Sequence, residues 1–419
     1  MAEGKLVGTK VEPQGAALPD GLVDGAAAVL RHEVVPFVSY PYEWTFAMLK
    51  DAALLQLELL GGALDENLIV KDSSPYNVQW RGASPLFIDV GSFESLREGE
   101  PWTGYRQFCM LFLYPLLLQA YKGAPFQPWL RGRLDGIEPQ ECRDLMSFRD
   151  LLRSGVLAHV LLHARLERRH ADSDRDIKGE LGRAGFKKEL IVANVTRLER
   201  LVRKLEWQPG ASAWSDYGPR AHYTDADSHR KAEFVRSVAA ERTWDLAWDL
   251  GCNDGRYSRI AAEHAHYVVA MDADAAVVDG LYQALREGGE TSILPLLVDV
   301  VDPSPALGWR GGERRTLIDR GTPELTLCLA LIHHVAIGGN VPVRDFLSWL
   351  RSLDSKLVIE FPTTDDPLVR RLLARKREGT HPDYERGYFE RCLGELFDVR
   401  SSEELSSGTR VLYVADPKA

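Results

Sequence analysis

Residues 246–256 read Leu-Ala-Trp-Asp-Leu-Gly-Cys-Asn-Asp-Gly-Arg, and this stretch decides the fold. An apolar segment that contains Asp249 gives way to two glycines, Gly251 and Gly255, and then to residues that favour a helix. This order predicts a buried strand, a tight glycine turn and a helix N-terminus, the place where an open α/β sheet accepts a nucleotide-like ligand. The glycines carry no Cβ atom, so such a ligand could approach the backbone closely.

The spacing Asp-x-Gly-x-x-x-Gly resembles the first motif of class I S-adenosylmethionine (SAM) methyltransferases. It differs from the dinucleotide fingerprint G-x-G-x-x-G and lacks the Lys-Ser/Thr ending of a phosphate-binding P-loop. The resemblance extends from about residue 214 to the C-terminus, and it implies a Rossmann-like seven-stranded sheet with SAM as the cofactor. The alternative is a glycine turn in an α/β protein of another kind.

Further buried strands follow the glycine turn in the order that this family requires. The expected strands are 267–271, 292–298, 325–330 and 356–361, with a closing antiparallel pair at 397–401 and 409–415. The expected helices are 254–263, 275–287, 343–353 and 368–376. The fold class is therefore α/β, a Rossmann-like methyltransferase sheet preceded by a mainly helical α+β domain.

The ends of these strands supply the candidate cofactor-binding residues. Asp272 ends the second strand, where a carboxylate can accept hydrogen bonds from both ribose hydroxyls. Asp299 follows the third strand, as a partner for the adenine amino group. Tyr217 and Tyr223 are expected to cover the sulfonium, since an aromatic face attracts a cation, although they could serve only in packing. The full set is Tyr217, Tyr223, Asp249, Gly251, Asn253, Gly255, Asp272, Ala273, Asp299, Val300 and Leu331.

His333 and His334 follow the fourth strand, at the edge where these folds place the methyl acceptor. A hydroxyl acceptor must lose its proton, and a histidine with a pKa near 7 suits that task. We expect one of the two to be a general base; alternatively, they line the cofactor or close the loop. The Asn/Asp-Pro-Pro-Tyr/Phe tetrapeptide of many amino-directed nucleic acid methyltransferases is absent from the sequence.

The N-terminal half contains a second motif. Apolar residues at helical spacing predict a helix over 44–64, with a break at the glycine pair 61–62. Asp72, then Asn77 five positions later, a short hairpin and Asp89-x-Gly resemble the catalytic and metal-binding loops of the protein-kinase fold. That resemblance would make Asp72 the base and Asn77 and Asp89 the magnesium ligands.

No Gly-rich loop or strand lysine precedes this segment, so we expect no phosphotransfer. The segment is then a kinase-like fragment reused as structure or as a substrate-binding platform, or a chance likeness. Segments 39–44, 71–79 and 87–93, followed by the methyltransferase pattern, resemble bacterial nodulation-protein-like methyltransferases over the whole chain. This resemblance implies methyl transfer to a glycan, a lipid-linked sugar or a secondary metabolite.

Composition limits the remaining classes. A chain of 419 residues exceeds one core, and we expect a domain over 1–165, a linker with an amphipathic helix over 166–213, and the methyltransferase domain over 214–419. The helix 190–205 is expected to pack on the catalytic domain. A net charge of −10 argues against nucleic acid as a partner. Five scattered cysteines without C-x-x-C spacing indicate no metal site and a cytoplasmic location, and no membrane span is expected.

The sequence therefore predicts a SAM-dependent methyltransferase that O-methylates a small molecule, a sugar or a glycan precursor in a bacterial biosynthetic pathway. Two alternatives stay open. One is a regulatory or bifunctional protein whose kinase-like segment binds a nucleotide or a partner, and the other is an N-methyltransferase. The sequence leaves the oligomeric state undecided.

Overall fold

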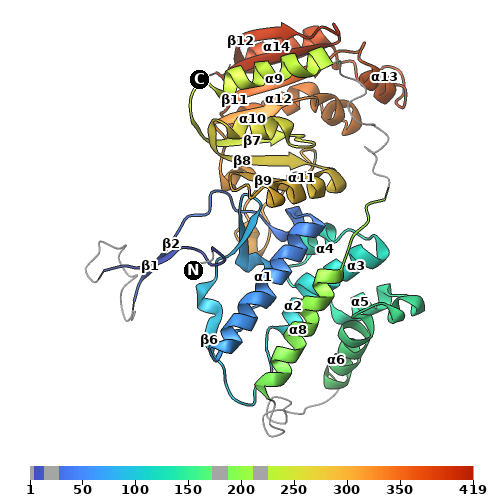
Figure 1. Ribbon diagram of the computed structural model, residues 1–419. Coiled ribbons are helices and arrows are strands. Elements are labelled where there is room, and N and C mark those ends of the chain that lie inside the picture. Colours follow the sequence, from blue (N-terminus) through green and yellow to red (C-terminus); the bar gives the residue numbers. More distant parts are fainter. Residues whose placement is uncertain (1–3, 14–27, 172–186, 211–224, 419) are drawn as a thin grey trace. The chain divides into compact units, whose positions relative to one another are not determined.

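The computed structural model describes residues 4–13, 28–171, 187–210 and 225–418 (Figure 1). The chain divides into two units. Unit 1 comprises residues 1–80 and 85–208, and unit 2 comprises residues 81–84 and 209–419. Among the described helices, none is both long enough and apolar enough to cross a membrane.

Unit 2 is built on a seven-stranded sheet with the strand order β12-β13-β11-β10-β7-β8-β9. Its strands are β7 (Trp244–Leu250), β8 (Ala265–Asp272), β9 (Ile293–Leu297), β10 (Leu325–Cys328), β11 (Lys356–Pro362), β12 (Phe397–Glu404) and β13 (Arg410–Pro417). Only β13 runs antiparallel to its neighbours β11 and β12 in this sheet. The predicted α/β fold with a seven-stranded sheet is confirmed.

The strand order reverses at β7. The chain moves from β7 to β8 and β9 on one side, then crosses to β10 on the other side of β7. Both β8 and β10 pair with β7 in parallel, so the carboxyl ends of all three strands lie at the same edge of the sheet. A crevice for a ligand forms at such a switch point in open α/β sheets.

The helices of unit 2 cover the sheet through apolar faces. They are α9 (Asp225–Ala239), α10 (Arg256–Ala262), α11 (Ala275–Glu287), α12 (Val343–Ser352), α13 (Pro367–Leu373) and α14 (Arg386–Leu396). On α12, buried residues recur at helical spacing, namely Val343, Phe346, Leu347 and Leu350. The helices α10 and α11 lie against β8 and β9, and α12 lies against α14 (Figure 1). Helix α14 itself was not predicted from the sequence.

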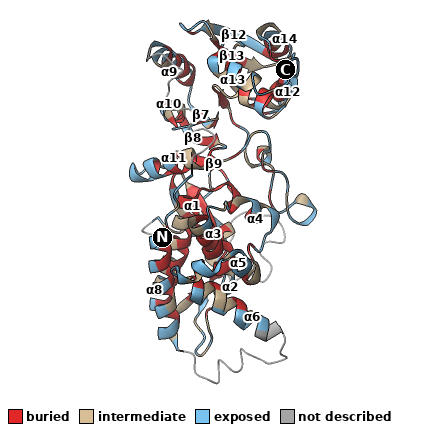
Figure 2. Ribbon diagram, turned by 90° about the vertical axis from the view of Figure 1, so that its right-hand side faces the viewer, coloured by how far each residue is buried: buried red, intermediate tan, exposed pale blue. Residues whose placement is uncertain are grey.

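Unit 1 is mainly helical, with buried residues concentrated along α1 and α3 (Figure 2). Its helices are α1 (Phe46–Asp65), α2 (Tyr105–Phe108), α3 (Tyr114–Lys122), α4 (Gln127–Gly132), α5 (Pro139–Leu145), α6 (His163–Ala171) and α8 (Lys188–Lys204). Three antiparallel pairs of short strands accompany them: β1 (Thr9–Val11) with β2 (Leu30–His32), β3 (Leu68–Val70) with β6 (Phe93–Ser95), and β4 (Val78–Arg81) with β5 (Ser84–Phe87).

Short turns of other helix types complete both units. The 3-10 turns are Pro41–Glu43, Pro75–Asn77, Val90–Ser92, Phe148–Leu152, Trp309–Gly311 and Ile318–Arg320. The π-helical turns are Cys109–Leu113, Val156–Leu162 and His334–Gly338.

One expectation for unit 1 was wrong. Helix α1 continues through Gly61 and Gly62 to Asp65 instead of breaking there. A glycine costs about 1 kcal/mol inside a helix, and burial of Leu60 and Leu64 on either side offsets that cost. The amphipathic helix α8 packs against α1 within unit 1, because its apolar stripe is matched by the apolar surface of α1.

Candidate functional site

The turn after β7 depends on left-handed backbone conformations. Gly251 has a φ of +75°, Asn253 of +49° and Gly255 of +73°. A Cβ atom at Gly251 would lie 3.2 Å from Leu331 Cδ1, and one at Gly255 would lie 2.5 Å from Leu281 Cδ1. The glycines therefore let the turn pass close to the side chains of Leu331 and Leu281.

Asp272 at the end of β8 ties this turn to the next strand. Its Oδ2 accepts a hydrogen bond from the Asn253 backbone N–H at 3.0 Å, and its Oδ1 accepts one from the Asp274 N–H, also at 3.0 Å. Burial raises the pKa of Asp272, and these N–H groups partly offset that rise. Each carboxylate oxygen keeps a further lone pair, so both can still accept hydrogen bonds from ligand hydroxyls.

Asp274 begins α11 beside Asp272. Its Oδ1 caps the helix by accepting hydrogen bonds from the N–H groups of Ala276 and Val277. Its Oδ2 is buried without a hydrogen-bond partner among the described residues. A buried carboxylate oxygen in this state is costly, and a ligand donor placed next to Asp272 would relieve that cost.

Asp249, in β7 just before the turn, is buried. Its side chain is 1% exposed, and its Oδ2 accepts a hydrogen bond of 2.6 Å from Ser258 Oγ on α10. Burial raises the pKa of Asp249 to about 6. This residue therefore holds the strand, the turn and the following helix together.

The other predicted cofactor residues lie along the same edge of the sheet. Ala273 and Asp299 are exposed after β8 and β9, and Asp299 Oδ1 accepts a hydrogen bond from the Val301 N–H at 2.9 Å. Val300 and Leu331 are half-buried. Tyr217 and Tyr223 lie outside the described residues.

The two histidines follow β10 at this edge, after Ala330 with a φ of +52°. Their rings lie 3.9 Å apart between centroids at an angle of 41°. His333 is 0% exposed, and in the described part of the chain neither of its ring nitrogens has a hydrogen-bond partner. Burial lowers the pKa of His334 to about 4, helped by the positive charge of Arg410. Burial also lowers the pKa of His333, so neither histidine has the pKa near 7 that we expected.

A buried ionic network beside the histidines was missed by the sequence analysis. Lys231 Nζ on α9 lies 2.5 Å from Glu360 Oε2 on β11, and Arg410 Nη1 on β13 lies 3.1 Å from Glu360 Oε1. Arg410 Nε also pairs with Asp366 Oδ2 at 2.7 Å. All four side chains are at most 3% exposed. The available signal was Glu360 itself, a charged residue inside an apolar strand.

The network helps to keep the histidines neutral. Arg410 and Lys231 both lower the pKa of His333, after the larger effect of burial. Burying four charges is expensive unless they pair well, and networks of this kind often mark functional sites. It lies near the carboxyl end of β11, where Glu360 joins Lys231 and Arg410.

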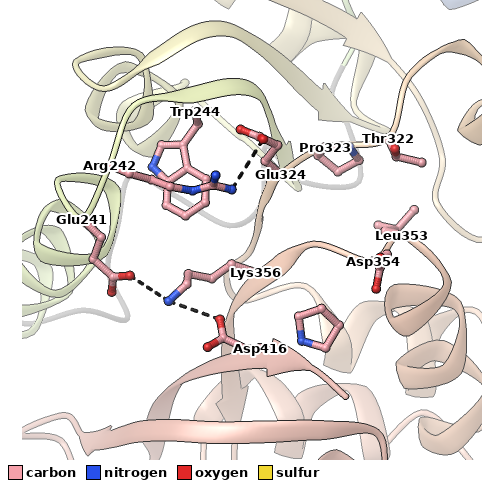
Figure 3. A pocket seen from close by; sticks show the side chains of 11 residues that line it. Glu241, Arg242, Trp244, Thr322, Pro323, Glu324, Leu353, Asp354, Lys356 and Asp416 are labelled. Atoms are coloured by element: carbon pink, nitrogen blue, oxygen red, sulfur yellow. Dashed lines mark hydrogen bonds and ion pairs between the residues drawn. The ribbon is translucent and has the colours of Figure 1, made fainter. Parts of the chain in front are cut away.

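A cleft of about 530 Å³ lies at the opposite edge of the sheet (Figure 3). Residues at the N-terminal ends of β7, β10 and β11 line this cleft, and its charged side chains pair with one another. Lys356 Nζ lies 2.7 Å from Glu241 Oε2 and 3.2 Å from Asp416 Oδ1. Arg242 stacks on Trp244 with its Cζ 4.2 Å from the ring centroid. The cleft contains none of the predicted site residues, so its size does not make it the site.

The kinase-like residues of unit 1 are partly brought together. Asn77 Nδ2 donates to Asp89 Oδ2 at 3.3 Å, and Asp89 Oδ2 also accepts a hydrogen bond from Ser92 Oγ. Asp72 is exposed, and its backbone oxygen accepts a hydrogen bond of 3.0 Å from the buried Gln56. In the described ranges, no three His, Cys, Asp or Glu side chains gather as a metal site would need. The kinase-like interpretation stays a prediction.

Comparison with known proteins places the chain in a family. No family model matches it. Over 414 residues it is 32% identical to nodulation protein NoeA of Rhizobium meliloti (strain 1021), a match that covers 98% of this chain and 86% of that protein. The chain belongs to the NoeA family. The predicted resemblance to nodulation proteins is thereby confirmed over nearly the whole length of this chain.

Solved structures that resemble this chain match about half of its length. The N-methyltransferase NodS of Bradyrhizobium japonicum WM9 is 12% identical with a TM-score of 0.35, over 46% of this chain and 98% of NodS. Magnesium protoporphyrin IX methyltransferase (ChlM) of Synechocystis PCC 6803, with bound S-adenosylhomocysteine (SAH), is 15% identical with a TM-score of 0.34, over 49% of this chain and 93% of ChlM.

Proposed function

We propose that this member of the NoeA family is a SAM-dependent methyltransferase that methylates a hydroxyl group of a small molecule, a sugar or a glycan precursor. One observation carries the proposal: the Asp272 carboxylate is fixed across the glycine turn, at the carboxyl edge where the strand order reverses. Carboxylates at this position bind the ribose of nucleotide-like cofactors in such sheets.

The residues present fit SAM. Gly251 and Gly255 allow the tight turn that would lie against the cofactor, since a Cβ atom at either position would meet a neighbouring leucine. Asp272 would accept hydrogen bonds from the ribose hydroxyls. Two residues later, Asp274 has a buried Oδ2 without a hydrogen-bond partner in the described part of the chain. Asp299 would accept from the adenine amino group. When bound, SAM supplies a methyl group on a positively charged sulfur.

His333 and His334 would act on the acceptor. A neutral imidazole can accept a hydrogen bond from a hydroxyl and orient its oxygen, and the low pKa of His334 keeps that ring neutral above about pH 5. Most of the rate would then come from holding the acceptor in line in a site from which water is excluded. Lys231 and Arg410 would position His333 and His334 through the buried ionic network.

A cytoplasmic location and a biosynthetic role complete the proposal. All five cysteines are free thiols, as expected of a protein in a reducing compartment. The relative's name connects that protein with nodulation, and the resemblance to nodulation-protein-like methyltransferases supports a glycan or lipid-linked sugar as the acceptor class.

The full chain with methyl-labelled SAM tests the reaction against three sets of acceptors: sugars, phenols and amines. We expect label on a hydroxyl oxygen, and we expect His334→Gln to lower turnover about tenfold while leaving SAH affinity unchanged, because the acceptor hydroxyl loses the hydrogen bond that orients it. Label on nitrogen would identify an N-methyltransferase instead. Normal turnover in both His334→Gln and His333→Gln would remove the histidines from the mechanism.

One observation favours a second candidate, nucleotide binding by unit 1. The contact between Asn77 and Asp89 joins two positions that the kinase-like resemblance singles out. Retention of ATP by the full chain, lost in Asp89→Ala, would support this candidate.

A further inference from the structure

Unit 1 exposes an unusual number of large apolar side chains in one short stretch. Phe148 is 88% exposed, Leu152 is 92% exposed and Leu157 is 53% exposed. Leu145, Leu162 and Leu166 are each more than two-fifths exposed. Single exposed apolar residues are ordinary, but a concentration of this kind marks a surface that binds something.

These residues belong to elements that pack together. Leu145 ends α5, Phe148 and Leu152 lie on the 3-10 turn Phe148–Leu152, and the remaining leucines lie on the π-helical turn Val156–Leu162 and on α6. These turns and helices contact one another within unit 1, and exposed residues run along α5 and α6 in Figure 2. We call residues 145–166 the apolar surface.

The side chains at the centre of this surface protrude. An exposed fraction near nine-tenths means that almost nothing surrounds Phe148 or Leu152. A groove for a peptide would instead shield its apolar lining on both sides. Protruding apolar side chains suit a soft, deformable partner that can close around them.

Exposed arginines lie in the same stretch of the chain as the protruding side chains. They are Arg143, Arg149, Arg153, Arg165 and Arg168. Of the acidic residues nearby, Asp150 is buried and pairs with Lys122 at 2.8 Å and with Arg153 at 3.3 Å. Glu167 pairs with Arg106 at 2.5 Å, and Asp144 pairs with Arg143 at 2.9 Å. Arg149, Arg165 and Arg168 are therefore left as the basic groups that form no ion pair with a described acidic side chain of this stretch. Asp144 is the acidic side chain that stays exposed in this stretch. The apolar surface is therefore basic on a chain whose net charge is −10.

We propose that the apolar surface docks on an anionic lipid bilayer. Phenylalanine and leucine would enter the boundary between headgroups and acyl chains, and the arginines would pair with lipid phosphates. Each basic residue near an anionic membrane surface contributes attraction that falls with salt. Docking would bring the protein to lipid-anchored molecules without a membrane-spanning helix, and it does not depend on the methyltransferase proposal.

Co-sedimentation of the full chain with vesicles tests this proposal. We expect binding to phosphatidylcholine vesicles that contain phosphatidylglycerol, weak binding to pure phosphatidylcholine, and loss of binding at high salt. Phe148→Ser/Leu152→Ser should weaken binding about tenfold or more, since each side chain loses its burial in the membrane. Arg149→Glu/Arg165→Glu should weaken binding similarly and reduce its salt dependence.

Trp309→Ser is the matched control, because Trp309 is a large apolar side chain of unit 2 that is 78% exposed. It should leave vesicle binding unchanged. The proposal fails if the full chain does not bind anionic vesicles, if pure phosphatidylcholine binds equally well, or if Phe148→Ser/Leu152→Ser binds like the unchanged chain. Self-association that Phe148→Ser/Leu152→Ser abolishes, without vesicle binding, would assign the surface to a second copy of the chain.

Discussion

Single residues determine the geometry of the proposed cofactor site. Gly251 and Gly255 adopt left-handed conformations that other residues adopt only with strain, and this lets β7 turn sharply into α10. Asp272 then fixes the turn by accepting a hydrogen bond from the Asn253 N–H, and Asp274 caps α11 two residues later. The chemistry of the site therefore depends on a few residues that the sequence spacing already indicates.

Replacing Gly255 by alanine should destabilise unit 2. The left-handed conformation costs an alanine about 1–2 kcal/mol in the free energy of unfolding, and its Cβ atom would also press on Leu281. Gly280→Ala is the control, because Gly280 lies inside α11 with open space around it and should gain up to about 1 kcal/mol. Urea denaturation of both variants measures the difference. Equal stabilities would contradict the strained turn.

His334 should stay neutral throughout the physiological range. Its pKa is lowered to about 4, whereas an unfolded histidine titrates near 6.5. The unfolded chain therefore binds a proton first as the pH falls, so this group reduces stability between about pH 6.5 and pH 4 and has no effect above pH 6.5. Imidazole NMR titration, assigned with His334→Gln, measures the pKa. A midpoint near pH 6.5 would contradict the buried position.

At the scale of secondary-structure elements, the ionic network joins helix α9 to strands β11 and β13 and to the start of α13. Its members come from segments 129 and 50 residues apart in the chain. Paired charges in a dry interior fix the relative positions of these elements, since each charge needs its partner. The positive charges of Arg410 and Lys231 also act on His333, in the segment after β10, by lowering its pKa.

Removing one partner of this network should be costly. Lys231→Met leaves the buried Glu360 with less compensation and should lower the free energy of unfolding by about 3–5 kcal/mol. Lys356→Met, which breaks more exposed ion pairs at the other edge of the sheet, should cost about 1 kcal/mol or less. Denaturation of both variants and of Lys231→Met/Glu360→Gln tests this. The double variant should be more stable than Lys231→Met, and additive losses would refute the coupling.

The sequence predicted elements better than it predicted their environment. Strands β7 to β13 were expected because apolar runs and glycine turns are local patterns, and helix α11 was predicted at Ala275–Glu287, where it lies. The network was missed because pairing across the sheet leaves no local pattern. The pKa of His334 was misjudged for the same reason, since burial depends on residues distant in sequence.

At the scale of the whole molecule, the two units differ in character. Unit 2 contains the sheet and the proposed catalytic site, while unit 1 contains the kinase-like residues and the apolar surface. Before α1, the described part of unit 1 contains only the strands β1 and β2, each of three residues, and the turn Pro41–Glu43. These described elements are too short to form the small lobe with which protein kinases position a triphosphate for transfer.

We therefore expect no kinase activity from the full chain. Asp72, Asn77 and Asp89 cannot position a γ-phosphoryl group without a lobe that holds the nucleotide. Incubation with labelled ATP and magnesium should give hydrolysis at the rate of buffer alone. ATP turnover that disappears in Asp89→Ala would show that unit 1 is an active phosphotransferase.

The central claim is that the carboxyl edge of the unit 2 sheet binds SAM through Asp272. Calorimetric titration of the full chain with SAH tests it most directly. We predict saturable binding that Asp272→Ala weakens by about 2–4 kcal/mol, because two charge-assisted hydrogen bonds are lost. Asp245→Ala, on the exposed opposite end of β7, should bind normally. Absence of SAH binding by the folded chain, or equal affinity in a folded Asp272→Ala variant, would contradict the account.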